Sequence, residues 1–350
     1  MPRHATIALA AGLGLVACAA ENQLTAPPPP VDWQSLAAPP TPPAPTAPRL
    51  TDRERAIAQR YLAALASPHC EKLTPLLDEA AHFWFAGREA LGPAAVVGHH
   101  AAIFGAFAQR QFKATRLLLA ASAQAIEWTM TGTQTGPWQG LPASGKPVVI
   151  RGLSLVGTSD DGIITDIRMY FDQAVVKAQL GVGPADLLAL PPATVSDAPP
   201  LVVEQPAPDH AATNAGVMRM MLQDLEDAKE SDFLATFADD IQVFTQDRAE
   251  PMTGKQAARG YYRTLHKAIR QLDTVTENAW DVGQFAIVEY SITGVQRTPL
   301  GRIPLVPDRA LNLRFTDIAE IHDGKITRIW RYDDLEARAA DPTPATPPLK

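Results

Sequence analysis

Side chains able to contact a small molecule are spread over both halves of the sequence rather than gathered in one motif. Aromatic rings with a polar atom and glutamine amides can combine apolar contact with hydrogen bonding. We predict either a related pocket in each half or one pocket and a relic of a second, although each residue taken singly is more often found in packing. The first set is His82, Trp84, Gln111, Trp128, Gln134 and Tyr170, with His99 and His100 nearby; the second is Gln246, Tyr261, Tyr262, His266, Tyr290 and Trp330.

Two local patterns suggest a bound cofactor, and the spacing argues against both. His99 and His100 are adjacent, so their side chains diverge on a helix, and no acidic residue or third histidine stands at ligand spacing. The glycines at 132, 136, 140 and 145 lie between predicted strands and open no helix, unlike a phosphate loop. We therefore predict no metal centre and no phosphate loop.

Composition narrows the class of partner. The chain is 46% hydrophobic and 20% charged, which suits globular domains, and its formal charge of -7 without a long basic run argues against nucleic acid. Its only cysteines are Cys18 and Cys70. If Cys18 is acylated, Cys70 has no partner for a disulfide, and we predict that it is a packed small residue rather than a reactive one.

The N-terminus predicts export and lipid anchoring. Arg3 and His4 precede an apolar run that is too short to span a bilayer, as in a signal peptide. The run ends in Leu15-Val16-Ala17-Cys18, which resembles a bacterial lipobox with Cys18 as the lipidated residue. Several acyl chains on this residue would hold an exported protein at a membrane of the cell envelope. The alternative is an ordinary signal peptide cut near Ala20.

Proline-rich stretches divide the rest of the chain. We predict a signal at 1–18, a stalk at 19–50, a first domain at 51–182, a linker at 183–209, a second domain at 210–338 and a disordered tail at 339–350.

One domain is written twice in this sequence. The stretch at 161–172, DGIITDIRMYFD, returns at 323–334 as DGKITRIWRYDD, and EWTMTGTQ at 127–134 returns as EYSITGVQ at 289–296. Both pairs are shifted by 162 positions, which indicates an internal repeat.

Each copy predicts helices first and strands afterwards. Ile57, Tyr61, Leu62 and Leu65 have helical spacing, as have their counterparts from Val217 to Leu225. Short helices at 71–77 and 232–237, brief strands at 80–85 and 241–246 and helices beginning near Gly98 and Gly254 come next. Strands at 115–122, 125–131, 148–156 and 164–171, with counterparts in the second copy, follow, and Asp-Gly pairs predict a hairpin between the last two. We expect an α+β fold: two tandem cone-shaped domains, each a curved antiparallel sheet wrapped around helices.

Residues 127–181 resemble the SnoaL-like polyketide and ester cyclases of the nuclear transport factor two-like superfamily. The resemblance is carried by the glycine-threonine run at 132–136, the turn at 142–146, the Asp-Gly pair at 161–162, the closing Asp172 and the Gln-Leu-Gly at 179–181. The second copy keeps the hairpin, Gly294 and the closing Asp334, but it lacks the turn and the tail.

The resemblance implies cofactor-free proton abstraction by a carboxylate at the end of the last strand, so Asp172 and Asp334 are the candidate general bases. Two departures weaken this implication. Gln134 and Gln296 replace the usual histidine, and Arg168 replaces an aromatic residue, which would make the pocket more polar. We expect Arg168 to pair with Asp166, two residues away on the same face, and not with Asp172. The alternative for both aspartates is a structural carboxylate at a strand end.

Together these features predict a membrane-anchored lipoprotein whose two domains pair within the chain and bind a small apolar or carbonyl-bearing molecule. Two alternatives remain, namely a cyclase- or isomerase-type enzyme using Asp172, and an envelope scaffold.

Overall fold

The computed structural model describes residues 52–120, 122–191, 195–204, 213–301 and 303–333. Cys18, the stalk, Asp334 and the tail lie outside these residues, so the predictions about them stay predictions. No helix in the described ranges has the length and apolarity needed to cross a bilayer.

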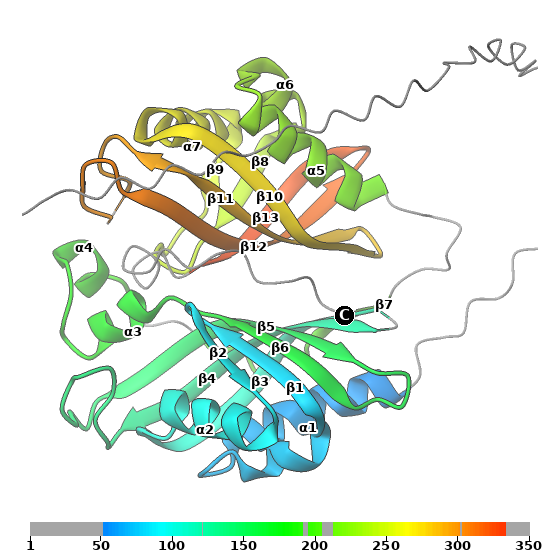
Figure 1. The fold of residues 1–350 in the computed structure, drawn as a ribbon, viewed down its shortest axis with the longest axis vertical. Helices are drawn as coiled ribbons and strands as arrows, with labels where there is room; N and C mark the ends of the chain where they lie inside the picture. The colour runs from blue at the N-terminus through cyan, green and yellow to red at the C-terminus, as the bar shows by residue number, and fades with distance from the viewer. Residues whose placement is uncertain (1–51, 121, 192–194, 205–212, 302, 334–350) are drawn as a thin grey trace, which may run out of the picture. The chain divides into compact units, whose positions relative to one another are not determined.

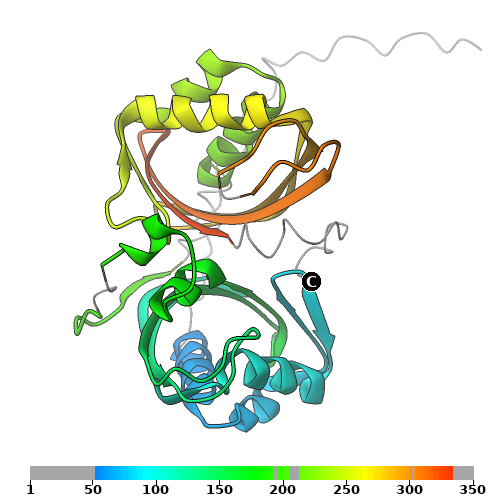
Figure 2. The ribbon, with the colours of Figure 1, turned by 90° about the vertical axis from the view of Figure 1, so that its left-hand side faces the viewer.

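The first domain packs three helical segments on a curved sheet (Figures 1 and 2). Helix α1 (Asp52–Ala66) buries the predicted stripe of Ile57, Tyr61, Leu62 and Leu65, and η1 (Glu71–Leu76) and α2 (Pro93–Phe104) follow. The strand order is β2-β1-β6-β5-β4-β3-β7. The strands are β1 (Leu77–Phe85), β2 (Arg88–Leu91), β3 (Phe107–Leu119), β4 (Ala123–Gln134), β5 (Pro147–Thr158), β6 (Ile164–Tyr170) and β7 (Leu201–Glu204).

The second domain repeats this order without a counterpart of β7 among the described residues. Its sheet runs β10-β11-β12-β13-β8-β9. The helices are α5 (Thr213–Glu226), α6 (Glu230–Ala235) and α7 (Gly254–Ala268); the strands are β8 (Phe237–Phe244), β9 (Met252–Thr253), β10 (Ile269–Val282), β11 (Phe285–Gln296), β12 (Ala310–His322) and β13 (Lys325–Asp333).

The two sheets are mixed, whereas we expected purely antiparallel sheets. The first long strand of each domain runs parallel to the last, with β1 against β6 and β8 against β13. The predicted Asp-Gly hairpins are confirmed, since β5–β6 and β12–β13 are antiparallel and Gly162 and Gly324 have φ of 77° and 69°. Positive φ is a conformation that glycine adopts without a steric cost.

Some elements differ from the sequence expectation. Helix α2 begins at Pro93 rather than near Gly98, because proline suits the first turn of a helix and Gly92 precedes it with φ of 82°. Helices α3 (Gln173–Gln179) and α4 (Ala185–Leu188) follow the last strand of the first domain. Within the predicted linker, β7 pairs in parallel with β3.

Apolar side chains form a separate core inside each domain, as the repeat requires. One cluster extends from Ile57 to Leu180 and another from Val217 to Ile329. A third cluster draws residues from both sheets, including Trp84, Leu118 and Tyr170 from the first and Phe285 and Tyr332 from the second. Both faces of each sheet are therefore covered by apolar contacts.

Candidate functional site

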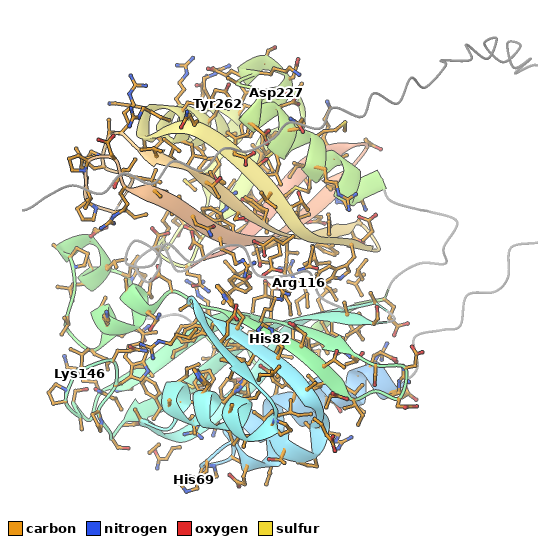
Figure 3. All side chains as sticks on the ribbon, viewed as in Figure 1. His69, His82, Arg116, Lys146, Asp227 and Tyr262 are labelled. Carbon is orange, nitrogen blue, oxygen red and sulfur yellow. The ribbon has the colours of Figure 1, made fainter. Side chains whose placement is uncertain are left out.

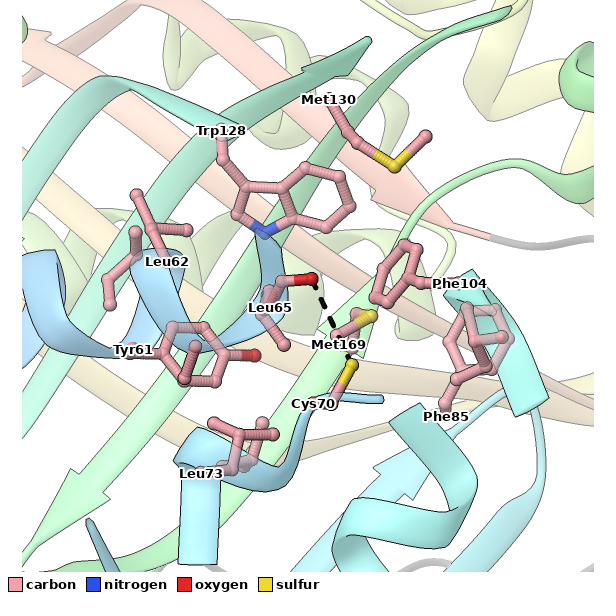
Figure 4. Close-up of a cluster of buried hydrophobic side chains, with 14 of the residues drawn as sticks. Tyr61, Leu62, Leu65, Cys70, Leu73, Phe85, Phe104, Trp128, Met130 and Met169 are labelled. Carbon is pink, nitrogen blue, oxygen red and sulfur yellow. Dashed lines mark hydrogen bonds between the residues drawn. The ribbon is translucent and has the colours of Figure 1, made fainter. Parts of the chain in front are cut away.

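The interior of the first domain is filled by aromatic rings. Trp128, a predicted pocket residue, is 1% exposed and lies near Phe104 (Figure 4). Its ring centre is within 6.2 Å of the ring centres of Phe104, Phe112 and Phe171. Cys70 is buried in the same cluster, where burial raises the pKa of its thiol to about 11. The prediction of a packed cysteine is confirmed.

A serine and a glycine on β5 make room for the Trp128 indole. Its Nε1 donates to Ser154 Oγ at 3.0 Å, and the Tyr61 hydroxyl lies 3.0 Å from the same oxygen. Gly152, opposite Trp128 on the neighbouring strand, has no side chain, and a Cβ there would stand 2.3 Å from the indole. These residues join α1 to the sheet and leave their polar atoms satisfied.

The interior of the second domain instead holds a buried ionic network. Asp317 is 0% exposed and accepts hydrogen bonds from Arg331 Nε at 2.9 Å and Nη2 at 2.7 Å. The Tyr290 hydroxyl donates a hydrogen bond to Asp317 at 2.9 Å and accepts another from Arg331 Nη2 at 2.9 Å. The Tyr261 ring, on α7, covers the Arg331 guanidinium at 4.4 Å. Such a cluster can orient a polar group of a bound molecule.

The Tyr261 hydroxyl is the least satisfied member of this network. It is buried, and among the described residues it makes no hydrogen bond of ordinary geometry. Burial raises its pKa, and the positive charge of Arg331 and the neighbouring Tyr290 hydroxyl oppose that rise. The group therefore stays a neutral donor.

Strand register explains how the same framework positions different groups. Asp317 pairs with Arg331 across β12 and β13, as Ser154 pairs with Met169 across β5 and β6. Our sequence reasoning placed Tyr261 and Tyr290 in the second pocket but missed Asp317 and Arg331. The repeat held a signal for Arg331, because a shift of 162 places it at Met169.

Asp172 lies at the start of α3 and lines a small cleft. Its carboxylate accepts a hydrogen bond from the Ala174 backbone at 2.8 Å, which caps the helix. Its backbone N–H donates to the Gln246 side-chain oxygen, and Gln246 Nε2 donates to the Arg151 carbonyl at 2.8 Å. Gln246, which we expected in the second pocket, thus lines the same cleft as Asp172, because the chain after β8 reaches β5.

Gln134 and Gln296 hold equivalent loops in the two domains. Gln134 Nε2 donates to the carbonyls of Gly136 and Pro142, and its oxygen accepts from Ser144. In the second domain Gln296 donates to the carbonyls of Thr298 and Pro304 and accepts from the Val306 backbone. Both amides are occupied by their loops, which explains why glutamine stands at both positions.

Several predicted pocket residues instead lie on the outer face of a sheet. Trp84, Tyr170 and Trp330 belong to the cluster that draws on both sheets, and His82 contacts Asp166 Oδ2 through Nδ1 at 3.0 Å. Figure 3 shows His82 and Arg116 on the side of the first sheet away from His69. Successive strand side chains point to opposite faces, and both faces are apolar here, so the pattern did not reveal which is inside. Gln111 on β3 is exposed.

Arg168 likewise lies on the outer face of the first sheet, although we expected it to face the pocket. Its predicted pairing with Asp166 is confirmed by a hydrogen bond of 3.1 Å. The expectation that it makes the pocket polar is wrong, because its Nη1 donates to Glu289 Oε2 at 2.9 Å while its neighbours Ile167 and Met169 face the core.

Two buried glutamates accept tyrosine hydroxyls in a reciprocal pattern. Tyr170 donates to Glu289, and Tyr332 donates to Glu127. The two pairs are related by the repeat shift of 162. Burial raises the pKa of both carboxyl groups.

His99 and His100 lie on α2, and Tyr262 and His266 lie on α7. His100 is buried; its Nδ1 contacts the Val96 carbonyl at 2.9 Å, and burial lowers its pKa to about 4. Tyr262, 162 positions later, is also buried, and its ring lies 4.4 Å from that of His266. Tyr262 therefore faces the second interior, and His266 lies beside it.

Comparison with known proteins connects both halves to one family. Residues 55–180 match the SnoaL-like polyketide cyclases, and residues 218–329 match the SnoaL-like domain. Comparison with curated proteins gives no match.

Solved structures resemble single domains of the chain. A Jannaschia sp. CCS1 protein provisionally described as a SnoaL-like polyketide cyclase is 18% identical and has a TM-score of 0.33; the match covers 37% of this chain and 94% of that one. TsrD from Streptomyces laurentii is 17% identical with a TM-score of 0.33, and the match covers 37% of this chain and 96% of that one. An LEH-like epoxide hydrolase from M. tuberculosis is 13% identical with a TM-score of 0.30, and the match covers 36% of this chain and 86% of that one.

Proposed function

Two domains of this chain belong to the SnoaL-like family, and from that premise we propose that it binds a small carbonyl-bearing molecule inside the second domain. The buried network of Asp317, Arg331 and Tyr290 supports this proposal. Charged groups are costly to bury, and an apolar core of similar volume is often at least as stable. The first domain fills the matching positions with Ser154, Met169 and Trp128. Stability of the fold therefore does not require the network.

The Tyr261 hydroxyl indicates the chemistry of the ligand. A buried hydroxyl without a hydrogen bond of ordinary geometry is uncommon in folded proteins, and a bound acceptor is one way to satisfy it. A ligand carbonyl oxygen would accept from Tyr261, while the apolar remainder would contact side chains such as Phe315 and Tyr262.

The groups at the candidate site of the first domain do not support turnover. A general base needs a carboxylate near the substrate, together with a donor for the developing oxyanion. The Asp172 carboxylate caps α3, and the Gln134 amide is held by its own loop. A cyclase- or isomerase-type enzyme using Asp172 is accordingly the less supported alternative.

Mass spectrometry of co-purifying small molecules tests this proposal. We compare the wild type with Asp172→Ala and with the double variant Asp317→Ser, Arg331→Met, which copies the first domain. The expected ligand is present in the wild type and in Asp172→Ala and is lost from the double variant. Loss or conversion that depends on Asp172 alone would favour the enzyme, and empty wild-type protein would favour the scaffold.

We also propose that this protein is held at a bacterial membrane surface, anchored through acylated Cys18. The lipobox-like Leu15-Val16-Ala17-Cys18 supports this proposal. Cells expressing the wild type should incorporate labelled fatty acid into the protein and retain it in the membrane fraction. Cys18→Ser should abolish both; incorporation that persists in this variant would contradict the anchor.

We further propose that the two domains pair through the outer faces of their sheets as an internal pseudo-dimer. The reciprocal bonds Tyr170–Glu289 and Tyr332–Glu127 support this arrangement, because a two-fold pairing makes each contact twice. Arg116 also covers the Trp330 ring at 3.7 Å, and Arg314 covers Trp84 at 4.8 Å.

Double-mutant cycles in the full chain test this pairing. Combining Tyr170→Phe with Glu289→Gln, and Tyr332→Phe with Glu127→Gln, should give coupling energies of about 1 kcal/mol or more in each cycle. A matched control cycle, Tyr170→Phe with Glu127→Gln, should show weaker coupling. Equal coupling in all three cycles would contradict the reciprocal contacts.

A further inference from the structure

The cleft beside Asp172 combines an apolar wall with two arginines. Strand β5 contributes Arg151, α3 contributes Val175 and Val176, α4 contributes Leu187 and Leu188, and the chain after β8 contributes Arg248. It is separate from the network around Asp317, which lies inside the second domain. Its volume is about 70 Å³.

Gln246, which lines this cleft, is held in a fixed position by hydrogen bonds. Gln246 is 8% exposed, and its amide joins the Asp172 backbone to the Arg151 carbonyl, so both polar ends are used. Fixed polar groups at the base of an apolar cleft are typical of small-molecule sites.

Charge complementarity identifies the occupant. Arg151 and Arg248 are exposed, and the guanidinium group of neither makes a hydrogen bond or ion pair with another of the described residues. The lining carries these two positive charges against the single negative charge of Asp172, which is already bonded to Ala174. The site therefore favours an anion, and the leucine and valine walls favour an alkyl group next to it.

We propose that this cleft binds a short-chain alkyl monocarboxylate, with its carboxylate at Arg151 and Arg248 and its alkyl chain against α3 and α4. The volume holds about five water molecules, so only a short chain fits before it reaches solvent. The arginine fork suits a carboxylate because it can donate two parallel hydrogen bonds.

Calorimetric titration of the whole unlipidated protein with acetate, butyrate, hexanoate, octanoate and dodecanoate tests the proposal. Affinity should rise about fourfold per added methylene while the cleft fills, and then level off. Hexan-1-ol, which lacks the charge, should bind at least about tenfold more weakly than hexanoate.

Variants assign any binding to this cleft. Arg151→Gln with Arg248→Gln should weaken hexanoate binding at least about tenfold, whereas Arg60→Gln, an exposed arginine of α1 outside the cleft, should leave it unchanged. Affinity that keeps rising to dodecanoate, equal binding of the alcohol, or an unchanged double arginine variant would overturn the proposal. These outcomes are independent of Asp317 and Arg331, so the ligand of the second domain is tested separately.

Discussion

The interiors of the two domains differ although their sheets have the same strand order. Where β4 and β5 place Trp128 opposite Gly152, β11 and β12 place Tyr290 opposite Phe315, with ring centres 5.3 Å apart. Two residues further along, the serine of the first domain is replaced by Asp317 in the second. One framework therefore supports either an aromatic filling or an ionic network, which shows that the fold alone does not fix the chemistry.

The largest effect is expected from a substitution that breaks the ionic network of the second domain. Arg331→Met should lower the free energy of unfolding by about 3–5 kcal/mol, because it leaves Asp317 buried without its cation. Adding Asp317→Ser should restore at least half of this loss, since it removes the uncompensated charge. Urea denaturation measures both values, and a double variant as unstable as the single one would show that the network is needed for folding.

The next largest effect is expected at low pH, which should destabilise the first domain more than the second. His100 has a pKa of about 4 in the folded protein and about 6.5 when unfolded, so the unfolded state binds more protons between these values. Stability from this group is present above pH 6.5 and is lost as the pH falls toward 4, by about 3 kcal/mol. The second domain has Tyr262 at the matching position and should be spared.

Hydrogen exchange measured at pH 6.5 and 4.5 should show first-domain amides losing protection before those of α7 and β11. His100→Gln is the matched control, because it keeps a polar side chain and removes the titration. A pH dependence that survives in this variant would assign the effect to another group.

The smallest effect is expected from a change in the packing around Trp128 in the first domain. Gly152→Ala should destabilise the protein by about 1–3 kcal/mol, because the added Cβ collides with the Trp128 indole. Gly98→Ala, on α2, has nothing within 4 Å of its added Cβ and should be neutral or stabilising by up to about 1 kcal/mol. Thermal denaturation compares the two, and equal effects would mean that the Trp128 ring moves aside.

Local patterns predicted the elements and much of the fold. The repeat, the amphipathic α1 and the Asp-Gly hairpins depend on neighbours in sequence, and the pairing of Arg168 with Asp166 follows from strand spacing. The sequence did not reveal which face of a strand is inside, so Trp84, Tyr170 and Trp330 were assigned to the wrong side. Asp317 was missed because the strand register, rather than the 162-residue shift, aligns it with Ser154.

Strand β7 has a consequence for solubility. By pairing with Arg116–Leu119 at the end of β3 it covers part of one border of the first sheet, so those backbone groups cannot recruit a strand from another molecule. The corresponding border of the second sheet, β10, has no such cover among the described residues. Two breaks in the register of β10 and the charged Arg270 and Asp273 make it a poor template for aggregation. Both features should limit edge-to-edge association between copies of this chain.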